Sequence, residues 1–427
     1  MAIAIILIFI LGYAGIAFEH SIRINKAATA LVTGVLCWTV YIISANNKEM
    51  VSEQLAHHFG DLSQILFFLM GSMAIVELID AHDGFEIITR QIKTTNKRKI
   101  LWIISLLTFF LSSVLNNLTT AIVMISLVRK LMTGRNDRLM MAGMIVIAAN
   151  AGGAWSPIGD VTTTMLWIGN QISPFSIILK LFVPSLVCLL APLLIIRNSF
   201  KGEIQKTEPA TENSGETSSI KDTMIVFVTG ILALLLVPVF TALTGLPPFM
   251  GILNGLGLMW MITETIHSSK DEEDRKKYSV GYALRRIDTS TILFFLGILL
   301  AVSALESTQQ LHHASVWMDN NLKDLNIIAG SLGLLSSIVD NVPLVAATQG
   351  MYNLENFPTD HYFWEFLAYS TGTGGSILII GSAAGVAVMG IEKIDFIWYL
   401  KKIGWLALIG YLAGAIVYIL QHRLLGI

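Results

Sequence analysis

Residues 112–124 read SSVLNNLTTAIVM, and residues 336–348 read SSIVDNVPLVAAT. Each stretch places two serines, two apolar residues and a polar pair ending in asparagine inside a longer apolar run. The polar pairs are Asn116-Asn117 and Asp340-Asn341. Because polar groups are costly in hydrocarbon, the repeated pattern indicates a built polar site.

The amino-acid composition indicates a protein embedded in a membrane. The chain of 427 residues is 54% hydrophobic and only 14% charged, whereas soluble domains carry about 25% charged residues. Long apolar runs recur from end to end, which predicts an all-α polytopic membrane protein. The net charge is −2 and no basic domain is visible, so no nucleic-acid partner is expected. The predicted apolar segments are 1–18, 27–45, 62–80, 100–128, 139–168, 174–196, 222–243, 249–266, 289–305, 326–350, 363–390 and 403–421.

The basic residues predict the topology. Six stretches hold 24 of the 28 Lys and Arg residues, and the positive-inside rule places them in the cytoplasm. Segment 100–128 has basic residues on both flanks, which predicts a re-entrant hairpin with its tip at Asn116-Asn117. Its arms of about 14 residues reach only the middle of a hydrocarbon core about 30 Å thick. Segment 326–350 is then a second hairpin from the opposite face, about ten full spans remain, and both termini are non-cytoplasmic.

Two further segments are predicted to be broken helices, because both carry glycines and polar residues in mid-membrane. Such breaks are tolerated only where the backbone lines a protein-enclosed or wet cavity. The segments are 139–168, with Gly152-Gly153, Gly159 and then Asp160, and 363–390, with Gly374-Gly375, Gly381 and then Ser382.

The matched phrases predict two inverted repeats. The hairpin tips lie 224 residues apart and the glycine pairs 222 residues apart. The expected domains are repeat 1 at 1–197, a cytoplasmic linker at 198–221, and repeat 2 at 222–427. Paired discontinuous helices in inverted repeats are typical of secondary transporters that bind at mid-depth.

Asp160 and Asp340 are the two ionisable residues that fall deep inside predicted segments. Residues of this kind are costly there and usually functional, so both are expected to hold a cation or a proton. The structural alternative is a helix-break cap satisfied by backbone N–H groups. Glu77, Asp80 and Lys180 fall near segment ends and are expected to reach the interface. The neutral oxygens expected around the two acids belong to Asn117, Thr119, Thr120, Asn150, Thr162, Thr163, Thr164, Ser336, Ser337, Asn341, Ser376 and Ser382, together with the carbonyls at the glycine pairs.

Four stretches resemble the NhaD-type sodium/proton antiporters. These transporters belong to a superfamily that includes arsenite permeases and sodium/dicarboxylate cotransporters. The similarity runs over essentially the whole chain. The stretches are GGAWSPIGDVTTTMLW (152–167), SSVLNNLTTAIVMISLVRKL (112–131), SSIVDNVPLVAA (336–347) and EHSIRINKAATALVTGVLCW (19–38).

The resemblance implies an elevator-type homodimer in a bacterial inner membrane that serves pH homeostasis. It implies exchange of cytoplasmic Na⁺ or Li⁺ for external H⁺, with no cofactor. One position departs from the family pattern. The first hairpin tip of the family commonly reads Asp-Asn, and this chain has Asn116 in place of the aspartate. The implied Na⁺ ligands are Asp160, Asn117, Thr162, Thr163, Asp340 and Asn341, and the other implied positions are Asn150 and Ser336.

Three alternatives remain open at the level of sequence. A sodium-coupled carboxylate or other anion transporter of the same fold is the nearest, although no Lys or Arg lies in the central phrases to bind an anion. A passive channel is distinguished by its lack of proton coupling. An intramembrane enzyme finds no support, because no HExxH or GxSxG motif is present.

Overall fold

A computed structural model describes residues 1–17, 19–89, 92, 94–132, 134–203, 219–268 and 270–426. These residues form helices and loops, and no strand is found among them. Most of the predicted linker, 204–218, lies outside the described residues.

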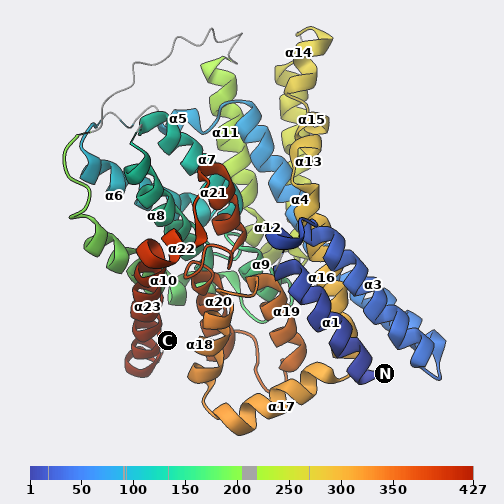
Figure 1. Cartoon of the computed structure of the whole chain (residues 1–427). Helices are drawn as coiled ribbons and strands as arrows, with labels where there is room; N and C mark the ends of the chain where they lie inside the picture. Colours follow the sequence, from blue (N-terminus) through green and yellow to red (C-terminus); the bar gives the residue numbers. More distant parts are fainter. Residues whose placement is uncertain are drawn as a thin grey trace.

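The helices of the first half end before the linker and those of the second half follow it (Figure 1). The first half contains α1 (Ala2–Ala17), α2 (Glu19–Ile22), α3 (Lys26–Ser44), α4 (Lys48–Ala81), α5 (Glu86–Thr89), α6 (Lys97–Ser112), α7 (Asn117–Leu131), α8 (Arg135–Ala154), α9 (Val161–Ile168) and α10 (Pro174–Ile196). The second half contains α11 (Ile220–Leu235), α12 (Val237–Thr244), α13 (Pro248–Ile266), α14 (Glu272–Lys277), α15 (Val280–Arg286), α16 (Thr289–Ser307), α17 (Gln310–Leu322), α18 (Leu325–Leu335), α19 (Asn341–Met351), α20 (Tyr362–Gly374), α21 (Ala383–Glu392), α22 (Phe396–Tyr399) and α23 (Trp405–Leu425), with a π-helical turn at Leu400–Gly404.

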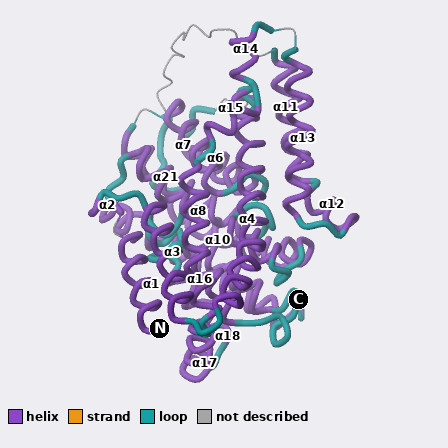
Figure 2. The backbone as a smooth tube through the Cα atoms, turned by 90° about the vertical axis from the view of Figure 1, so that its right-hand side faces the viewer, coloured by secondary structure: helices purple, strands orange, loops and turns teal. Residues whose placement is uncertain are grey.

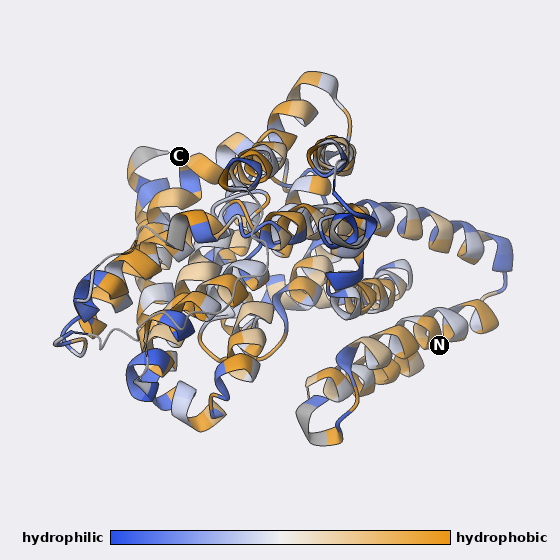
Figure 3. Cartoon of the chain, turned by 90° about the horizontal axis from the view of Figure 1, so that it is seen from above, coloured by the Kyte–Doolittle hydropathy of each residue, from blue (hydrophilic) through white to orange (hydrophobic). Residues whose placement is uncertain are grey.

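The long apolar helices identify a multi-pass membrane protein. In the described part of the chain, six continuous helices are long and apolar enough to span a membrane: α3, α4, α10, α13, α16 and the run from α22 to α23. The pair α11 and α12, bent by 44°, would be a seventh. Apolar residues lie along the helices, and polar residues gather at helix ends and loops (Figure 3). The predicted total of about ten spans stays a prediction.

Both predicted hairpins are present as helix–turn–helix pairs. The first turns at 113–116 between α6 and α7, and the second turns at 336–340 between α18 and α19. The 16 residues of α6 extend about 24 Å and the 11 residues of α18 about 16 Å, both less than the thickness of a hydrocarbon core of about 30 Å, and the re-entrant course of the hairpins stays a prediction. Figure 1 shows α6 and α7 in the upper half of the molecule and α18 and α19 in the lower half.

Both predicted broken helices are also present. The first break, 155–160, separates α8 from α9, and the second, 375–382, separates α20 from α21. The helices before the two breaks, α8 and α20, form the centre of the protein, because α8 from Met141 onward and α20 from Phe363 onward are buried at every position.

The helix contacts of the two halves correspond. In the first half α6 packs on α8, and in the second half α18 packs on α20. The second arm of each hairpin packs on a broken helix of the other half. Helix α7 packs on α21, and α19 packs on α9. At the centre, α8 and α20 pack on each other.

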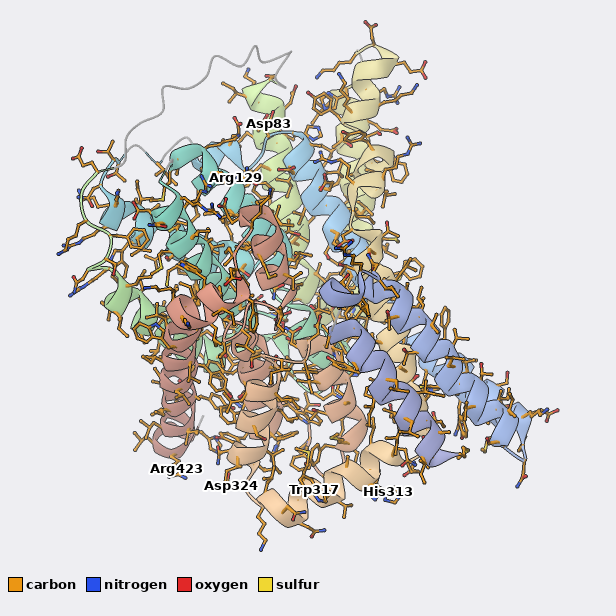
Figure 4. The ribbon with its side chains drawn as sticks, viewed as in Figure 1. Asp83, Arg129, His313, Trp317, Asp324 and Arg423 are labelled. Atoms are coloured by element: carbon orange, nitrogen blue, oxygen red, sulfur yellow. The ribbon has the colours of Figure 1, made fainter. Side chains whose placement is uncertain are left out.

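Charged and polar side chains mark the two ends of the helices. Asp83 and Arg129 lie at the upper end, and His313, Asp324 and Arg423 lie at the lower end (Figure 4). Both chain termini lie toward the lower end, whereas α14 lies at the opposite end (Figures 1 and 2).

Candidate functional site

Four short helices begin at the hairpin turns and helix breaks. Their first residues are capped by Asn116 on α7, Asp160 on α9, Asp340 on α19 and Ser382 on α21. Each cap accepts a backbone N–H with its side-chain oxygen, which satisfies one of the donors that a helix start leaves unpaired. Helix N-termini carry partial positive charge and the facing C-termini expose carbonyl oxygens, so the breaks offer sites for both anions and cations.

Close backbone packing holds the hairpins against the broken helices. A methyl group on Gly152 would overlap the Phe109 carbonyl of α6, and one on Gly374 would overlap the Gly333 carbonyl of α18. The other predicted glycines, Gly153 and Gly375, also face backbone, with Gly159 and Gly381 across each break. All four glycines therefore allow close backbone approach at the breaks, and the role expected of their carbonyls as ion ligands stays a prediction.

Serine hydroxyls connect the same elements. Ser112 Oγ donates to Ala149 O at 2.6 Å, and Ser336 Oγ donates to Thr371 O at 2.9 Å. The hydroxyl of Ser336, predicted as an ion-site residue, therefore joins the second hairpin to α20.

A buried amide network joins the two halves. Asn117 Nδ2 donates to Asn150 Oδ1 at 3.1 Å. Asn150 Nδ2 in turn donates to Ser376 Oγ and to Ser382 Oγ, both at 2.9 Å. Asn150 is fully buried. The structure therefore brings Asn117 and Asn150, which precede the linker, together with Ser382, which follows it.

The carboxylate of Asp160 lies beside the tip of the second hairpin. Asn341 Nδ2 donates to Asp160 Oδ2 at 3.2 Å, and Thr162 N donates to Asp160 Oδ1 at 3.5 Å. Asp160 is 2% exposed, and in the described part of the chain no basic side chain lies within ion-pair distance of it. A buried carboxylate without a cationic partner is costly unless a cation or a proton joins it.

Threonine oxygens surround this carboxylate. Thr163 and Thr164 donate their hydroxyls to backbone carbonyls, at 2.9 Å from Asp160 O and 3.0 Å from Pro157 O. Thr162 Oγ1 is buried and has no hydrogen-bond partner among the described residues. Thr162 is thus the threonine whose hydroxyl is free to face an ion.

Asp340 has a basic partner that the sequence did not suggest. Its Oδ2 lies 3.5 Å from Lys26 Nζ, at the first turn of α3, and its Oδ1 accepts the Val342 N–H at 3.4 Å. Sequence analysis found no Lys or Arg in the central phrases and grouped Lys26 with the cytoplasmic basic residues. The available signal was a lysine directly after a capping asparagine, at the start of an apolar segment.

Asn116 and Thr119 lie at the tip of the first hairpin, where Thr119 lines a cavity of about 540 Å³. Asn116 Oδ1 accepts the Thr119 N–H at 2.8 Å, and Thr119 lines the cavity with residues of α4. Glu77 and Asp80, expected at the interface, line the same cavity, and Arg286 Nε lies 2.7 Å from Glu77 Oε1.

Two further buried acids were not recognised in the sequence. Glu365, on α20, is 1% exposed, and its carboxylate lies 2.9 Å from Lys180 Nζ and accepts the Ser176 hydroxyl at 2.7 Å. Glu392, at the end of α21, lies 2.7 Å from Arg138 Nε. Glu365 lies at the start of the predicted segment 363–390 and Glu392 just beyond its end, so both are buried in the protein without lying deep in a predicted segment. Both extra acids have basic partners, which leaves Asp160 as the unpaired one of these four.

The fold and the site define a polytopic membrane protein with buried polar side chains at paired helix breaks. A family model described as "Citrate transporter" matches residues 7–364. The chain is 48% identical to "Sodium/proton antiporter 1" of Arabidopsis thaliana, covering 99% of this chain and 73% of that protein. It is 45% identical to "Sodium/proton antiporter 2" of the same plant, over 98% and 99%, and 30% identical to "Na(+)/H(+) antiporter NhaD" of Vibrio cholerae, over 99% and 91%. The chain belongs to the citrate transporter family and to its NhaD-type antiporters, and it is a transporter, not an enzyme.

Proposed function

We propose that this protein exchanges Na⁺ for H⁺ across a membrane, with Asp160 as the carboxylate that the two ions share. The observation that carries the proposal is the burial of Asp160 without a basic partner in the described part of the chain. The named relatives, plant and bacterial sodium/proton antiporters, support Na⁺ and H⁺ as the ions.

Competition for one carboxylate is sufficient for exchange. The Asp160 carboxylate can hold a proton or accept Na⁺, but the second ion cannot bind while the first remains. The unpartnered hydroxyl of Thr162 supplies a neutral oxygen at the start of α9, in keeping with the oxygen ligands that hard cations prefer. Asn341 Nδ2 donates a hydrogen bond to the carboxylate. We propose that Li⁺, which is also a hard monovalent cation, uses the same site.

We further propose that two inverted repeats produce alternating access by an elevator movement. The corresponding contacts of the two halves support the repeats: α6 on α8 matches α18 on α20, and α7 on α21 matches α19 on α9. In the proposed movement the hairpins and broken helices travel together, while α3, α4, α13 and α16 remain with the membrane. We propose a homodimer in a bacterial inner membrane with both termini outside the cytoplasm, and the shared lower position of the termini agrees with this topology (Figure 1).

The second candidate is sodium-coupled transport of a carboxylate. It is favoured by the description of the matching family model, which names citrate. Helix N-termini at the breaks could hold a carboxylate without a basic side chain. The same vesicle experiment distinguishes the two candidates, because only the antiporter moves protons when Na⁺ is added without a carboxylate.

The test uses purified protein in proteoliposomes with an acidic interior and a pH-sensitive dye. Addition of external Na⁺ or Li⁺ should release internal protons, whereas K⁺ or citrate should not. In the Asp160→Asn variant the response should fall to that of empty liposomes, because an amide carries neither a proton nor a full charge. The helix start should survive, since Asn caps a helix about as well as Asp.

A matched control is Asp324→Asn. Asp324 also caps a helix, α18, but its side chain is exposed at the lower end of the molecule (Figure 4). This variant should transport normally. Undiminished Na⁺-dependent proton release from Asp160→Asn would refute the role of Asp160, and citrate uptake in place of proton release would favour the second candidate.

A further inference from the structure

The second hairpin is joined to the helices around α3 by one ion pair. Lys26 Nζ lies 3.5 Å from Asp340 Oδ2 and 4.3 Å from the centre of the Phe294 ring on α16. Both charged side chains are partly exposed, at 21% for Lys26 and 15% for Asp340. The ammonium is therefore held between a fixed aromatic ring and the tip of the hairpin.

Several contacts fix the backbone from which Lys26 extends. Asn25 caps α3 by accepting the Ala27 N–H at 2.8 Å, and it also accepts the Ser290 hydroxyl at 3.1 Å. Lys26 N donates to Glu19 Oε1 at 3.1 Å. The other acid beside Lys26 is thus engaged with backbone, and the ammonium is directed to Asp340.

A small cavity of about 50 Å³ adjoins the ion pair. Its lining includes Tyr13, Glu19, Lys26 and Asp340, together with apolar side chains of the hairpin and the second broken helix. Tyr13 Oη is buried and has no hydrogen-bond partner among the residues that the structure describes. A volume of this size holds about one water molecule, whose share of liquid volume is about 30 Å³, or one dehydrated cation. The Asp340 carboxylate and the Tyr13 hydroxyl therefore both line a small space beside the Lys26 ammonium.

We propose that Lys26 is a tethered competitor for the cation at Asp340. Its ammonium neutralises the carboxylate while α19 of the hairpin is packed on α16, and it leaves when Na⁺ binds there. This inference rests on the proposed sodium/proton exchange and adds a second residue to it. Two positive charges beside one partly buried carboxylate repel each other, so Na⁺ binding at Asp340 and docking of the hairpin on Lys26 exclude each other. Ion loading is thereby coupled to release of the hairpin.

In the described part of the chain, the tip of the first hairpin has no ion pair equivalent to Lys26–Asp340. Asn116 occupies the position that corresponds to Asp340, and its side-chain oxygen accepts the Thr119 N–H. An uncharged amide does not attract an ammonium strongly. The acid and its tethered cation therefore occur together at one of the two hairpin tips, which makes the two half-cycles of transport chemically different.

The first test measures the apparent KM for Na⁺ in proteoliposomes for the wild type, Lys26→Gln and Lys26→Arg. Without the competing ammonium, Lys26→Gln should lower the KM about three- to fivefold, the range that a partly exposed ion pair supplies. Lys26→Arg keeps the charge and should leave the KM equal to the wild type or higher. Lys323→Gln is the matched control, since it removes a lysine that is exposed at the end of α17, and its KM should not change. An unchanged or raised KM in Lys26→Gln would overturn the proposal.

The second test uses the wild-type protein, so it does not depend on the folding of a variant. An amine-reactive reagent is applied with saturating Na⁺ or with choline, and modification of Lys26 is quantified by mass spectrometry. Na⁺ should raise the labelling of Lys26 several-fold and leave Lys323 unchanged, and in Asp340→Asn the labelling should be high without Na⁺. Equal labelling in Na⁺ and choline, in a protein that exchanges Na⁺ for H⁺, would refute the tethered competitor. If another cation raises the labelling of Lys26 in a protein that shows no Na⁺-dependent proton movement, the proposed Na⁺/H⁺ exchange is refuted, whereas the role of Lys26 as a competing cation is supported.

Discussion

Replacement of Gly374 by alanine tests whether the second hairpin packs on the broken helix as closely as the structure shows. Gly374 is the last residue of α20, and an added methyl group would overlap the Gly333 carbonyl oxygen and lie 2.8 Å from its carbon. Real Cβ atoms essentially never approach closer than 3.0 Å. The obstacle is backbone of α18, which is itself in close contact with Ser370 and Tyr411, so it cannot move aside as a flexible side chain would.

The size of the effect follows from two opposing terms. Overpacking of this kind costs about 1–3 kcal/mol, and the rigid backbone places Gly374→Ala at the upper end. Replacing glycine by alanine near a helix end returns at most about 1 kcal/mol of helix propensity. The free energy of unfolding should therefore fall by about 2 kcal/mol, which lowers the thermal midpoint of a chain of 427 residues by about 2 °C.

The assay is thermal unfolding of purified protein in detergent, followed by the transport assay in proteoliposomes. Gly390→Ala is the matched control, because Gly390 lies within α21 and a methyl group there would meet nothing within 4 Å. Its thermal midpoint should stay level or rise by at most about 1 °C. If Gly374→Ala unfolds within about 1 °C of the wild type and transports with the same KM, the close contact between α18 and α20 is not part of the folded protein.

Asn116→Asp should shift the alkaline limb of the pH–activity profile upward, because it adds a carboxylate beside Asn117, whose N–H donates to Gly159 O, next to Asp160 in the chain. An unchanged profile and voltage response would limit Asn116 to capping α7. Burial lowers the pKa of the His267 imidazole, past the end of α13, from 6.5 to about 4. The unfolded chain therefore binds this proton first as the pH falls. The contribution of His267 to stability should be constant above pH 7 and decline between about pH 6.5 and 4. In thermal unfolding, His267→Gln should reduce that decline. Lys180→Met leaves the buried Glu365 carboxylate without its cation and should lower the free energy of unfolding by about 2–3 kcal/mol, less than for a fully buried pair because Lys180 is 21% exposed. The double variant with Glu365→Gln should recover most of the thermal midpoint, and failure to recover would show that the ion pair is not the cause.

The sequence by itself located the elements that carry the site. The first hairpin tip was predicted at Asn116-Asn117, and α7 begins at Asn117. The second was predicted at Asp340-Asn341, and α19 begins at Asn341. These features are local, because a polar pair inside an apolar run can be satisfied only where the helix stops and its side chains cap the next one. The same reasoning placed the breaks after the glycine pairs of α8 and α20.

The tertiary structure alone decided which polar groups meet. Asn341 contacts Asp160 although 181 residues separate them, and Asn150 reaches Ser382 across 232 residues. Asp340, also predicted as an ion-site carboxylate, lies 3.5 Å from Lys26 Nζ, a partner that the sequence did not indicate. Each step along a helix turns the side chain by about 100°, so a contact between two helices depends on their rotation and crossing as well as on residue type. Those quantities are set by the packing of the whole bundle, and for this reason the sequence could identify the polar residues but not their partners.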